Sequence, residues 1–327
     1  MKRREFAKLG IKTLGAGMVS RPFILSALAG GQTENRFPVV TVARNEKIFG
    51  HEGVIDQRLL STILHESVKR ATGESSPEAA WSSRFSKRDV VGIKVNSLAG
   101  AGLWSHVELV NAIIDGLRMA GVRDENILIW DRLSRELTGA GFTINRSRSG
   151  VQCFGTDGAY EESPEVQGSV GSCFSMIVTR KCTALVNVPV LKDHDLAGVT
   201  LGLKNFFGAI NNPNKYHDNN CDPYVADLNS VRHIRKKLRL TICDGLIAQC
   251  DGGPAHKPDR AWKYAGLLVS TDPVALDWVG AQVIDARRKE TGLPPLAKVN
   301  RPPKHILTAA KAGLGIQDPS KAEIVTI

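Results

Sequence analysis

The segment 189–208 contains the densest group of side chains that could carry out chemistry. Lys192, His194, Lys204 and Asn205 surround an apolar stretch that glycines interrupt. A lysine buried in such a place has a lowered pKa and can act as a base or as a covalent nucleophile. A histidine exchanges protons near neutral pH. We therefore predict that His194 and Lys204 are catalytic and that Lys192 and Asn205 bind a cofactor; the alternative is that both lysines are solvent-facing charges.

The position at which the following helix begins decides whether these side chains can act together. If the helix begins at Asp195, a rise of about 13 Å or more separates His194 from Lys204, and the two cannot act directly. If Gly198 keeps the chain extended and Thr200 is the N-cap, Lys204 falls in the first turns, close to the loop that carries His194. The predicted site requires the second geometry.

A second group of candidates stands at the end of a predicted strand. Lys94 and Asn96 lead into a loop with Gly100 and Gly102, whose backbone N–H groups could face an anion before the next helix begins. Position 105 is serine, so the third glycine of the dinucleotide fingerprint is missing and a nicotinamide site is not favoured. We assign Lys94 and Asn96 to cofactor binding, with a plain flexible turn as the alternative for the glycine loop.

The remaining candidates are a loop histidine and acids at strand ends. His217 lies in the polar loop 211–218 and can serve as a metal ligand or as a general base; we predict a metal ligand. Asp244 and Asp272 follow predicted strands and are predicted to bind a cofactor. Asp272 can instead cap the following helix, and Asp277 lies in the first turns of that helix, where a carboxylate suits the helix dipole.

These candidates need a fold that brings strand ends together. Short apolar runs predict strands at 39–43, 90–95, 126–130, 184–188, 238–243, 266–270 and 324–327. Helical patterns occupy 55–71, 106–120, a stretch through 210, 224–237, 273–291 and 304–312, whereas 132–171 reads as loops and small elements. Strands separated by crossover helices predict an α/β protein with a largely parallel sheet, in which catalytic groups gather at the carboxyl ends of strands. We expect a single unit over 30–327, with two lobes divided near 140–180 and a cleft between them as a variant of this arrangement.

Residues 1–29 have the layout of an export signal. Arg3 and Arg4 precede a weakly apolar stretch and a small-residue site before Gly30, and the arginine pair resembles a twin-arginine signal. This resemblance implies export to the periplasm, with the twin-arginine translocase as a partner during export, by a route that carries folded proteins. The stretch is too polar for a stable membrane span. The alternative is an ordinary basic N-terminal helix.

Net charge and cysteine content limit the classes of ligand and partner that we expect. The signal holds six basic residues and one acid, so its removal lowers the formal net charge from +10 to +5. This mild excess favours a small anionic molecule. The dense basic run 232–239 is predicted to end a helix, and it has no aromatic stacking platform, so nucleic acid is not expected as a partner. The six cysteines form no C-x-x-C pair, so no iron–sulfur cluster is expected; disulfides and buried free thiols both remain open.

Taken together, the motifs resemble the domain of unknown function 362 family over roughly residues 39–280. The motifs that carry this resemblance are Lys94-x-Asn96, Pro189-x-x-Lys192-x-His194, Gly202-Leu203-Lys204-Asn205-x-x-Gly208, His217, Asp227, Asp244-Gly245, Gly253-Pro254 and Asp272-Pro273-Val274-Ala275-Leu276-Asp277. Some members carry a ferredoxin domain, for which this chain lacks the cysteines. The resemblance therefore implies an architecture more than a reaction.

The spacing His194-x₃-Gly198-x₅-Lys204, with a histidine downstream, is similar to a segment of nickel-pincer lactate racemases. That resemblance implies a metal or nickel-pincer-like cofactor attached to Lys204, with His217 as the nickel ligand and His194 as a proton-transfer residue. Leu203 replaces the arginine that commonly precedes the lysine. A second catalytic histidine has no match, and Asp131 stands at its place as the substitute.

Two functions follow from these observations as expectations. The first is an exported enzyme that acts on a small anionic substrate, such as a hydroxy acid, through lysine and histidine proton transfer with a metal cofactor. The second is a non-catalytic cofactor-binding or assembly subunit of a periplasmic redox complex. A polyanion-binding protein would depend on the modest charge excess alone.

Overall fold

The computed structural model describes residues 38–100, 102–317 and 323–327. The predicted export signal therefore lies outside the described residues, and the residues described here belong to one compact unit. Within these ranges no helix combines the length and the apolar character that a membrane crossing requires. All six cysteines are free thiols, and all but Cys173 are buried.

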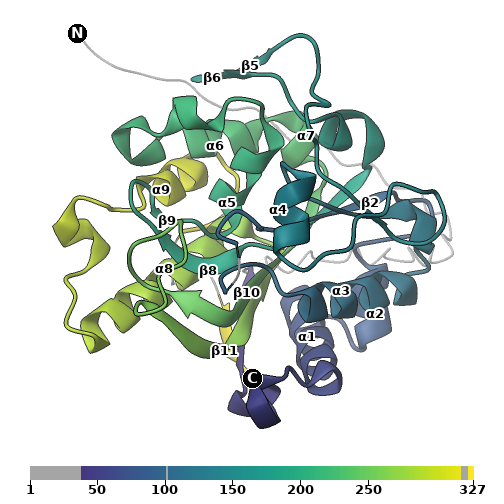
Figure 1. Ribbon diagram of the computed structural model, residues 1–327, viewed down its shortest axis with the longest axis horizontal. Helices are drawn as coiled ribbons and strands as arrows, with labels where there is room; N and C mark the ends of the chain where they lie inside the picture. Colours follow the sequence, from purple (N-terminus) through teal and green to yellow (C-terminus); the bar gives the residue numbers. More distant parts are fainter. Residues whose placement is uncertain (1–37, 101, 318–322) are drawn as a thin grey trace, which may run out of the picture. The chain divides into compact units, whose positions relative to one another are not determined.

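A mixed sheet of ten strands forms the centre of the unit (Figure 1). Eight strands follow the order β12-β1-β11-β10-β7-β2-β3-β4, namely β1 (Val39–Arg44), β2 (Val91–Lys94), β3 (Ile127–Trp130), β4 (Gln152–Cys153), β7 (Ala184–Asn187), β10 (Leu238–Gln249), β11 (Ala261–Ser270) and β12 (Glu323–Thr326). Neighbours along this path pair in parallel except at β11, which is antiparallel to both β1 and β10. The predicted α/β class with a largely parallel sheet is thereby confirmed.

Two further strands of this sheet lie beside the site described below. Strand β8 (Val190–His194) pairs in parallel with β10, and β9 (Gly198–Val199) pairs antiparallel with β8. Strands β5 (Glu165–Gln167) and β6 (Val170–Ser172) form a separate hairpin, which projects from the edge of the molecule in Figure 1.

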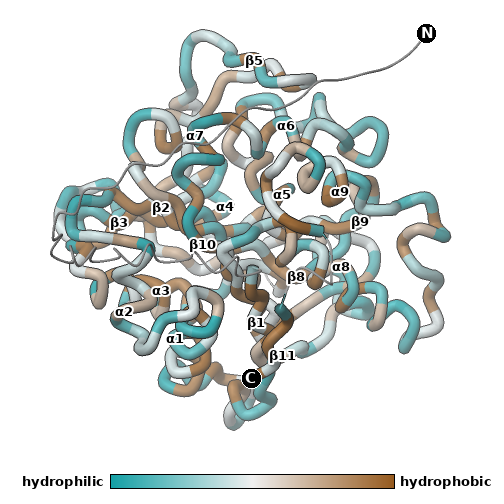
Figure 2. Tube along the Cα trace, turned by 180° about the vertical axis from the view of Figure 1, so that it is seen from behind, coloured by the Kyte–Doolittle hydropathy of each residue, from teal (hydrophilic) through white to brown (hydrophobic). Residues whose placement is uncertain are grey.

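Helices cover both faces of the sheet and bury two apolar cores. On one face lie α1 (Gln57–Thr72), α2 (Pro77–Ser82) and α3 (Val107–Met119); on the other lie α5 (Leu201–Asn205), α6 (Tyr224–Ser230), α8 (Pro273–Glu290) and α9 (Lys304–Lys311). Successive strand residues point to opposite faces, so that Leu267 and Val269 join the core under α1 and α3, whereas Leu268 joins the core under α8. Figure 2 shows hydrophobic residues gathered along the central strands and hydrophilic residues in the outer loops.

Several predicted elements have different bounds in the structure. The predicted helix 224–237 is divided into α6 and α7 (Arg232–Arg235), because Val231 between them has an extended backbone with ψ 133°. Strand β10 runs past residue 243, where the predicted strand ends, and its ladder with β11 continues beyond a bulge to the pair Gln249 and Ala261. Helix α4 (Ser134–Gly139), with six residues, is one of the small elements that were predicted for 132–171.

Candidate functional site

A cavity of about 210 Å³ opens at the carboxyl ends of the parallel strands. It contains eight of the ten side chains that the sequence singled out: Lys94, Asn96, Asp131, Lys192, His194, Lys204, Asn205 and His217. The rest of its lining is Leu98, Arg132, Glu136, Thr200, Phe207, Gly208, Pro213, Asn214 and Pro254. The cavity therefore joins strand ends, the β8–β9 segment, α5 and the 213–217 loop.

Parallel pairing explains how the strand ends converge. In the ladder register Lys94, the last residue of β2, stands opposite Trp130 on β3 and Asn187 on β7. Asp131 follows directly after β3, so it emerges at the same sheet edge as Lys94. On β8, Lys192 and His194 are two residues apart and lie on the same face of the strand.

The helix that carries Lys204 begins after Thr200, which is the second of the two geometries considered above. Gly198 has a φ of +81°, and a Cβ there would lie 2.3 Å from the Arg301 carbonyl oxygen, so only glycine fits. The Thr200 side chain does not cap the helix. Asp277 of α8, which is distant in the sequence, caps the helix instead. Its two carboxylate oxygens accept the N–H groups of Gly202 at 2.7 Å and Leu203 at 2.9 Å.

One lysine of the cavity is fully committed to an ion pair. Lys94 Nζ lies 2.7 Å from Asp131 Oδ1 and donates to the Val95 carbonyl at 2.6 Å, and both charged side chains are buried. Burial raises the pKa of Asp131, but Lys94 and the two hydrogen bonds from Ser97 outweigh it, so the net pKa is lowered. A Cβ at position 208 would lie 2.8 Å from Asp131 Oδ1 and 3.0 Å from Lys94 Nζ, so the pair requires Gly208.

A chain of side-chain amides connects the strands to α5 and orients one acceptor. Asn205 Nδ2 donates to Asn187 Oδ1 at 2.8 Å, which turns Asn205 Oδ1 toward Asn96 Nδ2 at 2.9 Å. Asn96 Oδ1 is then free to accept from Lys192 Nζ at 2.8 Å. Because each amide fixes the orientation of the next, the network sets the position of the Lys192 ammonium.

Lys192 is a buried cation with little compensation. It is fully buried, and within the described ranges no carboxylate lies within ion-pair distance of its Nζ. Burial lowers the pKa of Lys192 to about 7, although Asp131 and Asp193 act in the opposite direction. An anion that enters the cavity would therefore stabilise the ammonium form of Lys192.

Lys204 and His217 form an amine–imidazole pair. Lys204 Nζ lies 3.2 Å from His217 Nε2 and 4.1 Å from the centre of the Phe207 ring. Burial lowers the pKa of Lys204 to about 8. Burial and the nearby Lys204 also lower the pKa of His217, against hydrogen bonds to the Asn214 and Pro213 backbone. When Lys204 donates to Nε2, that nitrogen is the acceptor of the pair, and the neutral ring carries its proton on Nδ1.

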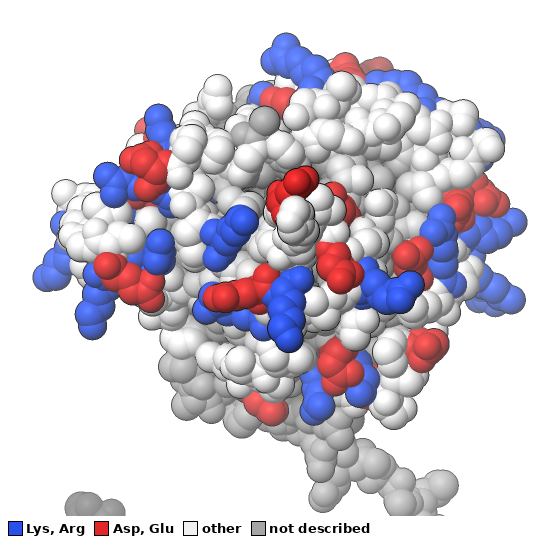
Figure 3. Space-filling model, turned by 60° about the horizontal axis from the view of Figure 1, so that its bottom comes forward, with Lys and Arg blue, Asp and Glu red and all other residues white. Residues whose placement is uncertain are grey.

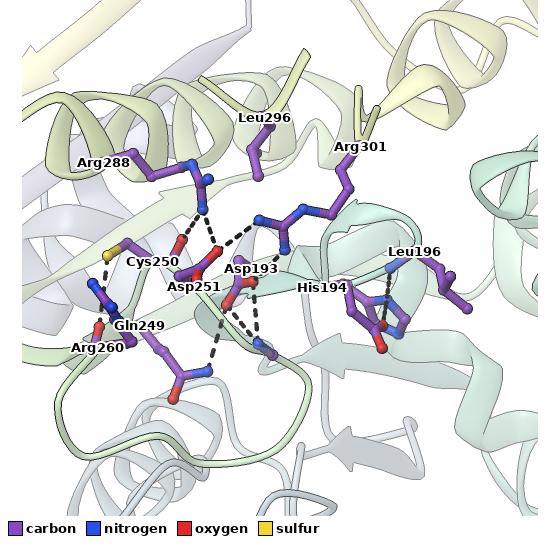
Figure 4. Close-up of polar contacts among 12 residues, drawn as sticks. Asp193, His194, Leu196, Gln249, Cys250, Asp251, Arg260, Arg288, Leu296 and Arg301 are labelled. Carbon is purple, nitrogen blue, oxygen red and sulfur yellow. Dashed lines mark hydrogen bonds and ion pairs between the residues drawn. The ribbon is translucent and has the colours of Figure 1, made fainter. Parts of the chain in front are cut away.

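His194 stacks on His217 with ring centres 5.6 Å apart and an angle of 25°. Its Nδ1 accepts the backbone N–H groups of Leu196 at 3.1 Å and Ala197 at 3.3 Å, the former visible in Figure 4. Burial and the neighbouring cations lower the pKa of His194 to about 2. Asp195 Oδ1 is 3.0 Å from Nδ1, but its side chain is 60% exposed and water screens it. The ring is therefore neutral and carries its proton on Nε2.

Strand β8 is held from its other face by an ionic network (Figure 4). Asp193 accepts the N–H of Gly253 at 2.9 Å and lies 3.2 Å from Arg301 Nη1, while Arg301 Nη2 lies 2.6 Å from Asp251. A Cβ on Gly253 would lie 2.2 Å from the Asp193 carbonyl oxygen, so this contact requires glycine. Burial raises the pKa of Asp193 to about 6. The network anchors the residue between Lys192 and His194.

The structure does not bring Asp244 and Asp272 together with the other candidates. Asp244 accepts the backbone N–H of His106 at 2.7 Å and lies 2.9 Å from its Nδ1, which ties α3 to β10. Asp272 caps α8 through the N–H groups of Val274 and Ala275, and its second oxygen accepts the N–H of Ile316. Both carboxylates lie outside the cavity and hold secondary structure in place.

Sequence reasoning did not identify Arg132 and Glu136 as part of the site. Both line the cavity, and Arg132 Nη2 lies 3.9 Å from Glu136 Oε1. Burial and Asp131 raise the pKa of Glu136. Their positions in the sequence could have identified them, because Arg132 directly follows Asp131 at the end of β3 and Glu136 is one helical turn further along, in α4.

Residues 91–282 match the family described as Domain of unknown function (DUF362). This range exceeds half of the chain and includes every residue that lines the cavity. No curated protein matches the chain. Over the described ranges, no group of three or more histidine, cysteine, aspartate and glutamate side chains is arranged to hold a metal ion.

Proposed function

We propose that this chain, a member of the DUF362 family, is an enzyme that transfers protons on a small anionic substrate. The description of the family names no activity. The observation that carries this proposal is the buried Lys204 amine, 3.2 Å from His217 Nε2 on the wall of a cavity lined by several lysines. A surface lysine would keep its ordinary pKa and water shell. An amine whose pKa is lowered to about 8 can exchange a proton with an imidazole near neutral pH.

Charge and volume support a small anion as the substrate. Lys94 is neutralised by Asp131, but Lys192 and Lys204 face the cavity without a carboxylate at ion-pair distance in the described part of the chain. The volume of about 210 Å³ lies below the range of about 300–1,000 Å³ that is typical of drug-sized ligands. On the face drawn in Figure 3, basic and acidic side chains are intermixed, which gives a polyanion no single-sign surface there.

Each residue of the cavity has a role in this proposal. Lys192 binds the anionic group of the substrate, and His194 donates its Nε2–H to a substrate oxygen, since its Nδ1 is occupied by two backbone N–H groups. Lys204 and His217 move the proton. This assigns proton transfer to His217, whereas the racemase resemblance implied that His194 transfers the proton.

The nickel-pincer-like cofactor expected from the resemblance fits the residues only in part. Lys204 and His217 are adjacent, as an attachment site and a single ligand would be. A cofactor of drug size exceeds a cavity of about 210 Å³, so the proposed steps use the protein's own side chains. Metal analysis and intact-mass measurement of protein purified from its native host test the cofactor directly.

Solvent exchange of substrate hydrogens tests the proposed reaction. The full chain is incubated in deuterated buffer with a panel of small 2-hydroxy and 2-oxo acids, and NMR follows deuterium incorporation. We expect Lys204→Met and His217→Gln to lower the exchange rate by about a hundredfold or more. Lys311→Met, at an exposed position on α9, serves as the control. Exchange that is unchanged in Lys204→Met, or that occurs with no acid of the panel, contradicts the proposal.

The second function, a cofactor-binding or assembly subunit, uses the same cavity as a ligand-binding site without turnover. Its support is that Lys192 and Lys204 suit an anionic ligand whether or not it reacts. Stable co-purification with a partner and a retained ligand, in the absence of any turnover, would favour it. We also propose export by the twin-arginine route, supported by Arg3 and Arg4 in the sequence.

A further inference from the structure

We propose that Lys204 is a nucleophile that forms an imine with a small 2-oxo carboxylate in the cavity. This inference depends on the proposed function, because it uses the same cavity and the same amine–imidazole pair. It adds a substrate class and a covalent step that proton transfer alone does not require.

The surroundings of the three lysines single out Lys204. Lys94 Nζ is engaged by Asp131, by the Val95 carbonyl and, at 3.4 Å, by Asn205 Oδ1. Lys192 Nζ is directed at Asn96 Oδ1. Lys204 Nζ has one polar neighbour within hydrogen-bond distance in the described ranges, His217 Nε2, and otherwise faces an aromatic ring.

This environment favours a free amine over an ammonium. A deprotonated Nζ donates one N–H to His217 Nε2 and keeps its lone pair for the cavity. Burial, which lowers the Lys204 pKa to about 8, provides that form at moderate pH. An ion pair with a carboxylate, as at Lys94, would instead have held the amine protonated and unreactive.

The same cavity provides a partner for each end of a 2-oxo carboxylate. The carboxylate pairs with the Lys192 ammonium, which has no carboxylate of its own at ion-pair distance in the described chain. The carbonyl oxygen accepts the Nε2–H of His194, which polarises the carbon toward attack. A simple hydroxy acid can bind in the same way but has no carbonyl carbon to attack.

The step is balanced without an oxidant or a reductant. The Nζ lone pair attacks the carbonyl carbon, a C–N bond forms, and the carbonyl π electrons move onto the oxygen. One proton from Nζ passes to His217 Nε2 and then to that oxygen, which gives a carbinolamine. The second Nζ proton leaves with the hydroxyl group as water, and the C=N bond of the imine remains.

Reductive trapping tests the imine. The full chain is mixed with pyruvate and sodium borohydride at a pH between the Lys192 pKa of about 7 and the Lys204 pKa of about 8, where both the ammonium and the free amine are populated, and intact-mass and peptide mass spectrometry follow. We expect one reduced pyruvate adduct per chain, located on Lys204, and none with lactate. Lys204→Arg should abolish the adduct, and Lys311→Arg, at an exposed position, should retain it in full.

The variant Lys192→Met tests whether Lys192 binds the carboxylate of pyruvate. Loss of one charge-assisted contact should raise the pyruvate concentration for half-maximal trapping by about tenfold or more, while saturating pyruvate still labels Lys204. Should Lys204→Arg fail to fold, peptide mapping of the trapped wild-type chain decides the question. An adduct on any other lysine, or no adduct, overturns the inference.

Calorimetry with lactate separates this inference from the proposed function. If lactate binds the wild-type chain and binds more weakly to Lys192→Met, but pyruvate leaves no adduct, the imine is overturned and the anion site stands. If neither lactate nor pyruvate binds and no adduct forms, both proposals are overturned.

Discussion

Lys192 makes the charge of the cavity depend on pH in a predictable direction. The free side chain has a pKa of about 7 because it is buried, and a bound anion raises that pKa by stabilising the ammonium. Binding is therefore strongest below a pH of about 7, where the free ammonium is already charged, and weakens as the pH rises through the pKa of the bound state. Calorimetric titration of lactate at a series of pH values measures this.

The variant Lys192→Met should weaken lactate binding and shift the remaining pH dependence upward. The amine that then dominates is Lys204, whose pKa is about 8. An affinity for lactate that stays constant across this whole range in the wild-type chain would show that neither lysine contacts the anion.

Gly208 is predicted to be indispensable because an ion pair lies against its α-carbon. In Gly208→Ala the new Cβ would lie 2.8 Å from Asp131 Oδ1 and 2.9 Å from Lys94 Cε, both on buried side chains. We expect a loss of stability of about 1–3 kcal/mol, typical of overpacking, together with weaker anion binding. Chemical denaturation measures the free energy of unfolding.

Gly139→Ala is the matched control for this substitution. Gly139 belongs to α4, and a Cβ there has no heavy atom within 4 Å. Alanine should be neutral or stabilise the protein by about 0.5–1 kcal/mol, since glycine is a poor helix former. Equal destabilisation by the two substitutions would refute the contact with the ion pair as the cause.

At the scale of elements, the start of α5 depends on a carboxylate from α8. Asp277→Asn would replace one acceptor oxygen with an NH₂ group that faces the N–H of Gly202 or Leu203. We expect a cost of about 1–3 kcal/mol for the unsatisfied buried N–H group. Because Lys204 lies in the same short helix, anion binding should also weaken.

Asp272→Asn separates a loss of capping from a loss of the site. Asp272 also accepts backbone N–H groups on both oxygens, but it lies outside the cavity. The asparagine keeps the cap of α8 and loses the contact with Ile316, at a cost of about 1 kcal/mol. Its lactate affinity should match that of the wild-type chain. If it lost binding as fully as Asp277→Asn, capping would not explain the difference between the two aspartates.

For the whole molecule, the arginine pair at positions 3 and 4 is predicted to direct export. Replacing both Arg3 and Arg4 with lysine keeps the charge and removes the signal, because the pair is read as a specific address. Cell fractionation should then find the unprocessed chain in the cytoplasm. Normal processing of the double variant would exclude the twin-arginine route, and N-terminal sequencing tests whether cleavage leaves Gly30 first.

The α/β class and most of the site's membership could be read from the sequence. Apolar runs of four to six residues, separated by helical patterns, leave few arrangements other than parallel strands with crossovers. The residues after those strands must then meet at one edge, which is why Lys94 and Lys192 were predicted to be site residues, whereas Asp131 was implied by the racemase resemblance. Local pattern and chain connectivity are sufficient for such conclusions.

The tertiary structure alone decided which polar group each side chain meets. Asp244 was predicted to follow a strand, yet it lies within β10 and accepts the N–H of His106 from a distant segment of the chain. Asp272 does follow a strand, and it caps the helix directly after it, which was the alternative that the sequence offered. The difference between Lys94, paired with Asp131, and Lys204, paired with His217, depends on packing between segments far apart in the chain. A pKa responds to burial and to charges within a few ångströms, and sequence spacing does not specify either.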